Sequence, residues 1–503
     1  MNLGDNSALT LQLLDHADAV RREVAPRIAL KRKSELGQFM TPAPVARFMA
    51  SLFPPATLQT CRLLDAGAGV GALTCAFLDR WTSGADLNFG RVEAEAHEID
   101  SALLAHLEEA LANYARRLPF TYKIFSGDFI LEAACRRMQT SAHFTHAILN
   151  PPYKKINSAS QHRLILRHAG IETVNLYSAF VGLTITLMAP GGQVVAIIPR
   201  SFCNGPYYRP FRRFLLRHAA LRHIHLFGSR TNAFKDDDVL QENVILRLER
   251  AAAQGDVTVS NSTDDKLADL TTHRHPFERI VFPDDPEQFI HVPTSPDRNA
   301  IELSPAIRYS LDEIGIGVST GPVVDFRLQE HILQLPGEGA VPLLYAGHFI
   351  GNTTEWPKDG IKRGNAIKRN AATERWLYPN GFYTVARRFS SKEERRRIVA
   401  SVVKPETFPN APMLGFENHL NVFHEDKHGL PETIAHGLAA FLNTTAVDEH
   451  FRRFNGHTQV NATDLRLMKY PSRGALNALG KWARSQNDLT QDMLDDQLNS
   501  FAG

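Results

Sequence analysis

One stretch near residue 65 constrains the fold more than any other part of the chain. The apolar run 62–64 is predicted to be a strand, and it leads directly into Asp65-Ala66-Gly67-Ala68-Gly69-Val70-Gly71 and then into the helical pattern 72–80. A strand, a glycine-rich turn and a helix in this order are typical of the nucleotide-binding start of an open α/β sheet, where the backbone approaches a ligand closely. The turn lacks the Lys-Ser/Thr ending of a loop that cradles a nucleoside triphosphate, which disfavours that ligand.

Acidic residues follow the turn at the ends of later predicted strands. Glu98 lies about where a doubly wound sheet places the acid that binds ribose hydroxyls, and Asp100 competes for that role. The third predicted strand, 122–125, is followed by Asp128, a candidate acceptor for an adenine amino group, and by Phe129, a candidate cover for the ring. The simpler interpretation is that such an acid caps the next helix and that the phenylalanine belongs to the core.

The tetrapeptide Asn150-Pro151-Pro152-Tyr153 ends an apolar strand and carries the most specific chemistry of the chain. An amino nitrogen attached to a nucleobase is a poor nucleophile, because its lone pair is delocalised into the ring. The side-chain carbonyl of Asn150 and the main-chain carbonyl of Pro151 can accept both amino hydrogens and draw the nitrogen toward tetrahedral geometry. Tyr153 would then stack on the base. The simpler interpretation is a strand that ends in a rigid proline turn.

Length and cysteine content leave room for an enzyme with a separate recognition domain. A chain of 503 residues exceeds a single hydrophobic core and favours two or three domains. Its four cysteines form no Cys-x-x-Cys pair, so the sequence suggests neither a disulfide framework nor a zinc site. No apolar run is long enough to cross a membrane and the N-terminus lacks the core of a signal peptide, so we expect a cytoplasmic protein.

Basic residues gather between residues 350 and 400, although the net charge of the whole chain is only +2. This segment has twelve Lys/Arg against five Asp/Glu, interleaved with aromatic residues such as Trp376, Tyr378 and Tyr383. We interpret it as a phosphate-contacting surface of a nucleic-acid-binding domain, with a solvated helix face as the alternative for 392–397. The basic candidates for DNA contact are Lys154, Lys362, Arg363, Lys368, Arg369, Arg387 and Arg388.

The order of these motifs resembles one family. Residues 35–250 resemble the class I S-adenosylmethionine-dependent methyltransferases, and within them the gamma-type N6-adenine DNA methyltransferases of Type II restriction–modification systems. The segment 37–42, Gly-Gln-Phe-Met-Thr-Pro, is similar to the family's N-terminal cofactor motif, and 175–180 is similar to a helix that lines the cofactor pocket. The resemblance implies a Rossmann-like α/β sheet with flanking helices, followed by an α+β target-recognition domain. It also implies S-adenosylmethionine as the cofactor and double-stranded DNA as the substrate.

The resemblance also implies roles for single residues. The cofactor-binding set is Thr41, Asp65, Gly67, Gly69, Gly71, Glu98, Asp128 and Phe129. Within it, Thr41 would contact the methionine part, Glu98 the ribose hydroxyls and Asp128 the adenine. The catalytic set is Asn150, Pro151, Pro152 and Tyr153. Phe234 would stack on the second face of the target base, and the alternatives for this position are Phe202, Tyr207 and Phe227.

Methyl transfer to adenine in a duplex requires base flipping, because the amino group is paired and shielded inside the helix. Neither a metal ion nor a cysteine nucleophile is required for this chemistry. The first 35 residues are too short for a nuclease domain, so we expect a separate restriction endonuclease as functional partner and a monomeric enzyme. The segment 459–466 is similar to the branch of the family that recognises CTGCAG. RNA adenine or cytosine N4 as the acceptor, or a non-catalytic DNA-binding defence component, are the alternatives.

We therefore expect five segments. A shift to Ala, Gln, Asp, Ser, Thr and Pro marks a linker after the catalytic part. The segments are an N-terminal helical extension (1–34), the catalytic domain (35–250), the linker (251–300), the DNA target-recognition domain (301–475) and a C-terminal helical tail (476–503).

Overall fold

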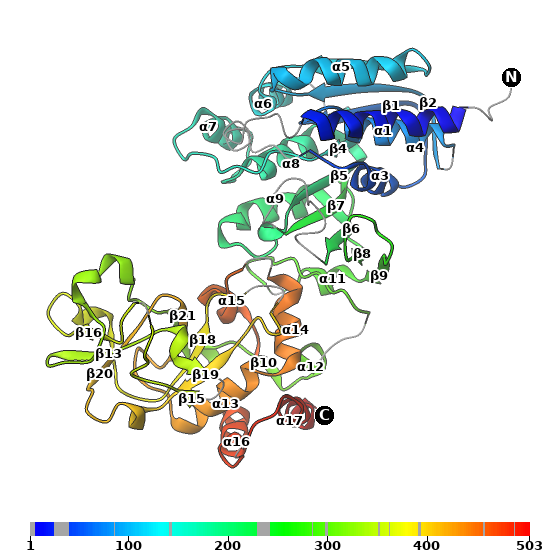
Figure 1. Ribbon diagram of the computed structural model, residues 1–503. Helices are drawn as coiled ribbons and strands as arrows, with labels where there is room; N and C mark the ends of the chain where they lie inside the picture. Colours follow the sequence, from blue (N-terminus) through cyan, green and yellow to red (C-terminus); the bar gives the residue numbers. More distant parts are fainter. Residues whose placement is uncertain are drawn as a thin grey trace. The chain divides into compact units, whose positions relative to one another are not determined.

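The chain divides into two units, residues 1–296 and 297–503, which run from blue to green and from green to red in Figure 1. The structure is a computed structural model. It describes residues 6–24, 40–84, 86–139, 143–228, 242–283, 285–296, 300–350, 353–361, 363–390, 394–455, 458–486 and 488–502. Two residues predicted to contact DNA, Phe234 and Lys362, lie outside these ranges, as do residues 37–39 of the predicted motif 37–42.

The first unit is built on one nine-stranded sheet with the order β3-β2-β1-β4-β5-β7-β6-β8-β9. The pairs from β3 to β5 are parallel, whereas β7 is antiparallel to both β5 and β6. The strands are β1 (Ala56–Ala66), β2 (Leu87–His97), β3 (Phe120–Phe125), β4 (Phe144–Leu149), β5 (Met188–Pro199), β6 (Ala219–Phe227), β7 (Asn243–Arg250), β8 (Val257–Ser262) and β9 (Thr271–His275). The carboxyl ends of β1, β2 and β4 therefore lie at one edge, where an open parallel sheet binds its ligands.

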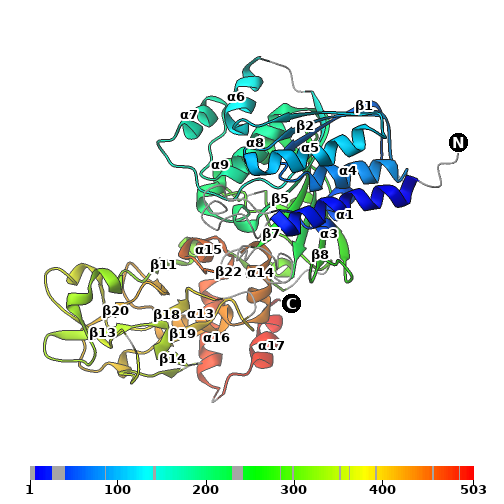
Figure 2. The same cartoon turned by 45° about the horizontal axis from the view of Figure 1, so that its top comes forward.

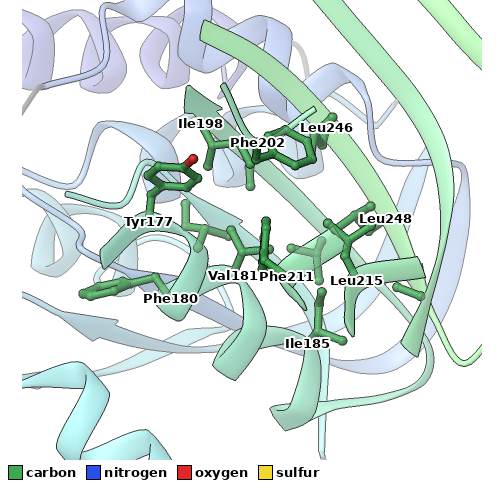
Figure 3. Close-up of a cluster of buried hydrophobic side chains, with 14 of the residues drawn as sticks. Tyr177, Phe180, Val181, Ile185, Ile198, Phe202, Phe211, Leu215, Leu246 and Leu248 are labelled. Carbon is green, nitrogen blue, oxygen red and sulfur yellow. The ribbon is translucent and has the colours of Figure 1, made fainter. Parts of the chain in front are cut away.

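Helices cover both faces of this sheet. One apolar cluster joins the sheet to α1 (Asn6–Val24), α3 (Ala43–Ser51), α4 (Ala72–Thr82) and α5 (Ser101–Ala115). The other joins it to α6 (Phe129–Gln139), α7 (Gln161–His168), α8 (Leu176–Leu187) and α9 (Arg209–His218). Neighbouring residues of β5 belong to opposite clusters, as the period of two along a strand requires. Figure 3 shows Val181 and Ile185 of α8 among side chains from β5, β7 and α9.

The predicted linker 251–300 is wrong over part of its length, because β8 and β9 extend the sheet there. Val257 and Val259 are fully buried, while much of β9 is exposed at the edge of the sheet. An edge strand with one solvated face is rich in polar residues, which makes its composition similar to that of a linker. The predicted strand–turn–helix and the α/β sheet with flanking helices are confirmed.

The second unit contains two small sheets and a group of helices. The sheets have the orders β11-β21-β18-β19 and β12-β16-β13-β20-β17, and two further pairs are β10-β22 and β14-β15. The strands are β10 (Ile307–Tyr309), β11 (Gly317–Thr320), β12 (Ile332–Leu333), β13 (Ala340–Leu344), β14 (Phe349–Ile350), β15 (Thr353–Thr354), β16 (Ala366–Lys368), β17 (Leu377–Pro379), β18 (Tyr383–Arg387), β19 (Ala400–Val403), β20 (Met413–Phe416), β21 (Leu420–His424) and β22 (Tyr470–Pro471). The helices are α12 (Ala300–Leu303), α13 (Glu432–Leu442), α14 (Thr445–Phe454), α15 (Ala462–Leu467), α16 (Arg473–Arg484) and α17 (Gln491–Ala502).

Helices α13 and α16 lie side by side in the second unit (Figures 1 and 2). They meet at Gly437 and Gly480, where a Cβ atom on either residue would overlap a carbonyl oxygen of the other helix. The two backbones are thus in direct contact. Because α16 is packed into the unit in this way, the predicted boundary at 475/476 falls inside a structural helix.

Among the residues described, no helix has both the length and the apolar character needed to span a lipid bilayer.

Candidate functional site

A cavity of about 400 Å³ opens in the first unit at the carboxyl ends of the parallel strands. Its lining comes from segments far apart in the chain, since Met40 and Phe180, which are 140 positions apart, both belong to it. The predicted site residues that the structure brings together here are Thr41, Gly67, Gly69, Glu98, Asp128, Phe129, Asn150, Pro152 and Lys154.

The glycine-rich turn forms one wall of the cavity. The backbone N–H groups of Gly67 and Ala68 both donate to the His97 carbonyl oxygen at 2.9 Å, which ties the turn to the end of β2. Gly67, Gly69 and Gly71 have φ values of +88°, +57° and +88°, which residues with a Cβ atom rarely adopt. A Cβ on Gly69 would meet nothing within 4 Å. The turn therefore leaves open space against its backbone, as the approach of a ligand requires.

Asp65 lies beneath this turn instead of facing the cavity, which differs from its predicted place beside the cofactor. Its side chain is completely buried, and the Thr74 hydroxyl donates to Oδ2 at 2.7 Å. Gly71 also lies outside the lining that the structure describes and is the N-cap residue of α4. Asp65 thus holds the turn to α4. Burial raises the pKa of the Asp65 carboxyl to about 7.

This raised pKa predicts how the stability of the first unit depends on pH. Below about pH 4 the carboxyl is protonated in both the folded and the unfolded chain, but between about pH 4 and about 7 only the unfolded chain releases the proton. Stability should therefore fall as pH rises through this window, by up to about 1.4 kcal/mol per pH unit from this group. Asp65→Asn should reduce this dependence of stability on pH. The free energy of unfolding is measured in urea at several pH values, by following peptides of β1 with mass spectrometry. Parallel pH profiles for the two proteins would contradict it.

Glu98 is the acid that faces the cavity. Its Oε2 accepts the Gly69 N–H at 2.8 Å and its Oε1 accepts the Asp100 N–H at 2.7 Å. Burial raises the pKa of the Glu98 carboxyl. Asp100, the competing candidate, is instead the N-cap of α5, where its side chain accepts the Ala102 N–H at 3.1 Å. The geometry favours Glu98 for ligand binding and gives Asp100 a structural role.

Asp128 combines a capping role with a place in the cavity wall. Its Oδ1 accepts the Ile130 N–H at 2.9 Å at the start of α6, and its Oδ2 lies 2.7 Å from Nε2 of His162. Phe129 beside it is buried, with its ring centroid 4.8 Å from that of Phe180. Asp128 thus caps α6 and also lines the cavity.

His162 lines the cavity but is not among the residues predicted from the sequence. It lies in α7, whose N-cap Ser160 also lines the cavity. Only its place in the sequence could have indicated it, because residues 154–162 directly follow the tetrapeptide and stay near the cavity.

Asn150 is held in a fixed orientation at the end of β4. Its Nδ2 donates to the Thr41 hydroxyl at 3.0 Å, and its Oδ1 accepts from the Tyr153 hydroxyl at 3.0 Å. That hydroxyl also lies 3.1 Å from the Ile197 carbonyl oxygen, and its single proton serves one acceptor at a time. Because the side-chain amide is bonded at both ends, its carbonyl and amino groups cannot exchange places without breaking both hydrogen bonds.

Tyr153 has its ring packed edge-on against Tyr177, with the centroids 6.2 Å apart. The cavity lining that the structure describes does not include Tyr153 or Pro151. In this conformation Tyr153 orients Asn150, and stacking on a base would require its ring to turn. Of the alternatives to Phe234, Phe202 and Phe227 are core residues, whereas Tyr207 is 76% exposed.

The basic cluster of the second unit contains many internal pairs. Arg369 donates to both carboxylate oxygens of Glu374, at 2.7 and 2.8 Å, and Arg387 is paired with Glu394. Arg388 donates to the Asn418 carbonyl oxygen at 3.1 Å, whereas Lys368 is exposed. The interleaved Tyr378 and Tyr383 are core residues and not surface aromatics. Fewer basic side chains are therefore available to contact phosphate than the number of Lys and Arg between residues 350 and 400 indicates.

Comparisons with known proteins agree with this geometry. The family described as Eco57I restriction-modification methylase matches residues 84–234. The Type II methyltransferase M.BsuBI of Bacillus subtilis is 54% identical over 478 residues, 94% of each chain. The Type II methyltransferase M.PstI of Providencia stuartii is 39% identical over 493 residues, 96% of each chain. The solved DrdV–DNA complex is similar in fold, with a TM-score of 0.50 and 13% identity over 94% of this chain and 59% of that one.

Proposed function

Because this chain belongs to the Type II DNA methyltransferases of restriction–modification systems, with S-adenosylmethionine as cofactor, we propose that it methylates the N6 amino group of adenine in double-stranded DNA. The observation that carries the proposal is the Asn150 amide, fixed by Thr41 and Tyr153 at the end of the cavity.

The residues around the cavity fit S-adenosylmethionine. Gly69 leaves open space beside its backbone, and the carboxylate of Glu98 stands at the end of β2, where ribose hydroxyls find an acceptor. Phe129 provides an aromatic wall and Asp128 a carboxylate beside it. When bound, the cofactor supplies an electrophilic methyl group.

Asn150 and Pro151 act on the amino group of the base. Two carbonyl oxygens accept the two amino hydrogens, which localises the nitrogen lone pair and aims it in one direction. Thr41 and Tyr153 keep the amide from rotating, so the acceptor is in position before the base arrives. Flipping the base costs a few kcal/mol, and stacking on aromatic residues, with Tyr153 and Phe234 as the proposed pair, offsets that cost.

The reaction is tested with labelled S-adenosylmethionine and a DNA that contains many sequence contexts. The expected product of nucleoside analysis is N6-methyladenine, and a reaction with S-adenosylhomocysteine in excess serves as the inhibited control. Label in N4-methylcytosine or in RNA would contradict the adenine assignment. Cofactor binding without label in any nucleic acid would indicate a non-catalytic DNA-binding protein.

Several features of the biological setting belong to the same proposal. We place catalysis in residues 35–250 and target recognition in 301–475, with CTGCAG as the recognised sequence. The enzyme works as a monomer in the cytoplasm and protects the host DNA from a separate restriction endonuclease. Methylation-sensitive sequencing of host DNA reads the site directly.

Replacing Glu98 by glutamine is expected to weaken S-adenosylmethionine binding by about 10- to 100-fold, because a hydrogen bond to a charged acceptor contributes about 1.5–3 kcal/mol. The measurement is the dissociation constant by calorimetry. Asp100→Asn is the matched control, since asparagine also caps helices and α5 should remain intact. Equal losses in the two variants would contradict the assignment of Glu98.

A further inference from the structure

The second unit contains a groove of about 590 Å³ that is separate from the cofactor cavity. Its lining comes from three places in the chain: the segment 325–334, Arg363, and the turn between β20 and β21 with Asn418 and His419. These segments meet beside the sheet β12-β16-β13-β20-β17. The groove is therefore built from long-range contacts and is a feature of the folded unit.

Three side-chain amides in this groove have unused hydrogen-bonding capacity. Gln329 and Gln334 are exposed, and among the residues that the structure describes neither side chain forms a hydrogen bond. Asn418 Oδ1 is buried and likewise has no hydrogen-bond partner in the described part of the chain. A buried carbonyl oxygen without a partner is costly, which points to a ligand that supplies a donor.

Acidic side chains hold Arg363 and His419 of the groove in place. Arg363 Nη1 donates to Asp325 Oδ2 at 2.8 Å, while the arginine side chain remains 56% exposed and the aspartate only 11%. His419 is held by the buried Glu417, whose Oε2 accepts the His419 backbone N–H at 2.9 Å and whose Oε1 contacts the ring nitrogen Nδ1. The remaining donors of Arg363 are thus presented on a rigid support.

The turn that carries Asn418 is also fixed. Its backbone N–H donates to the Val323 carbonyl oxygen at 2.9 Å, and its own carbonyl oxygen accepts from Arg388 at 3.1 Å. Phe326 stands beside the groove with 64% of its side chain exposed, and the guanidinium of Arg327 lies 5.4 Å from the centre of its ring. Rigid polar groups next to an exposed aromatic residue are typical of a recognition surface.

We propose that this groove reads base edges in the major groove of DNA, through Arg363, Gln334 and Asn418. This inference rests on the proposed function and deepens it. Amide side chains pair with the donor and acceptor of adenine, and the guanidinium fork pairs with the two acceptors of guanine. A phosphate oxygen only accepts hydrogen bonds and cannot satisfy the buried Asn418 Oδ1, whereas a base edge offers both donors and acceptors.

The test is the methylation pattern of host DNA in cells that express the wild-type enzyme or the variants Asn418→Ala, Gln334→Ala and Arg363→Lys. The lysine keeps a positive charge beside Asp325 but loses the planar fork. Asn410→Ala is the matched control, because Asn410 is exposed in the same unit and outside the groove. Thermal unfolding and the affinity for S-adenosylmethionine check that each variant is folded.

We expect one methylated motif for the wild-type enzyme and for Asn410→Ala. Each groove variant should methylate sequences with a substitution at one position of that motif, and its preference for the cognate base should fall by about 10- to 100-fold. Unchanged preference in all three folded variants would overturn the inference, as would an equal loss of activity on every sequence. A wild-type enzyme that methylates no DNA would instead overturn the proposed function, and the role of the groove with it.

Discussion

Replacing Asn150 by alanine is expected to lower the rate of methyl transfer by about 10²–10³-fold, while S-adenosylmethionine still binds within a few-fold of the wild-type affinity. The substitution removes the side-chain carbonyl that accepts an amino hydrogen of the base. It also removes the hydrogen bonds to Thr41 and Tyr153, at 3.0 Å each, but leaves the glycine turn and Glu98 unchanged. The loss should therefore appear in the chemical step and not in cofactor binding.

Single-turnover transfer and calorimetric cofactor binding separate these two effects. The matched control is Asn88→Ala, because Asn88 is exposed near the start of β2, at the end of the strand away from the cavity. The control should retain wild-type rates. Transfer by Asn150→Ala within tenfold of the wild-type rate would contradict the role of this residue, and loss of cofactor binding would assign Asn150 to the cofactor site instead.

Gly480→Ala should destabilise the second unit by about 3 kcal/mol or more, because the new methyl group would overlap the Thr433 carbonyl oxygen of α13. A flexible side chain can move away from such a contact, but a carbonyl inside a helix cannot. The two helices must separate, and the apolar side chains between them lose their close packing.

Gly474→Ala is the matched control in the same helix, since its Cβ would meet only Ser472 Oγ at 3.9 Å. This change should be neutral or slightly stabilising, because alanine favours a helix over glycine. Hydrogen exchange of α13 and α16, with first-unit peptides as internal reference, measures both effects. Equal protection of these helices in the two variants would refute the prediction.

The sequence predicted the α/β sheet, and nine of its candidate site residues line the cavity, because strand ends and turn residues carry local signals. Asp100 competed with the predicted Glu98, since both are acids at one strand end and only hydrogen-bonding geometry separates them. Asp65 was placed beside the cofactor because its position in the turn is visible in the sequence, whereas its burial depends on how α4 packs over β1.

The basic cluster illustrates a different limit. A charge count along the chain includes every arginine equally, although Arg369 and Arg387 are paired with acids five and seven positions away. The partner of Arg363, Asp325, lies 38 positions away, and no local pattern indicates it. The amides Gln334 and Asn418 attract no notice in the sequence at all, because their common groove exists only after folding.

The hydrogen bond between Thr41 and Asn150 has a thermodynamic consequence for the order of events in catalysis. It joins two side chains that are 109 positions apart, one assigned to the cofactor and the other to the target base. In the proposed function, the two ligands therefore share one structural element. If cofactor binding improves the alignment of Asn150 and so strengthens binding of the flipped base, the flipped base must strengthen cofactor binding by the same free energy.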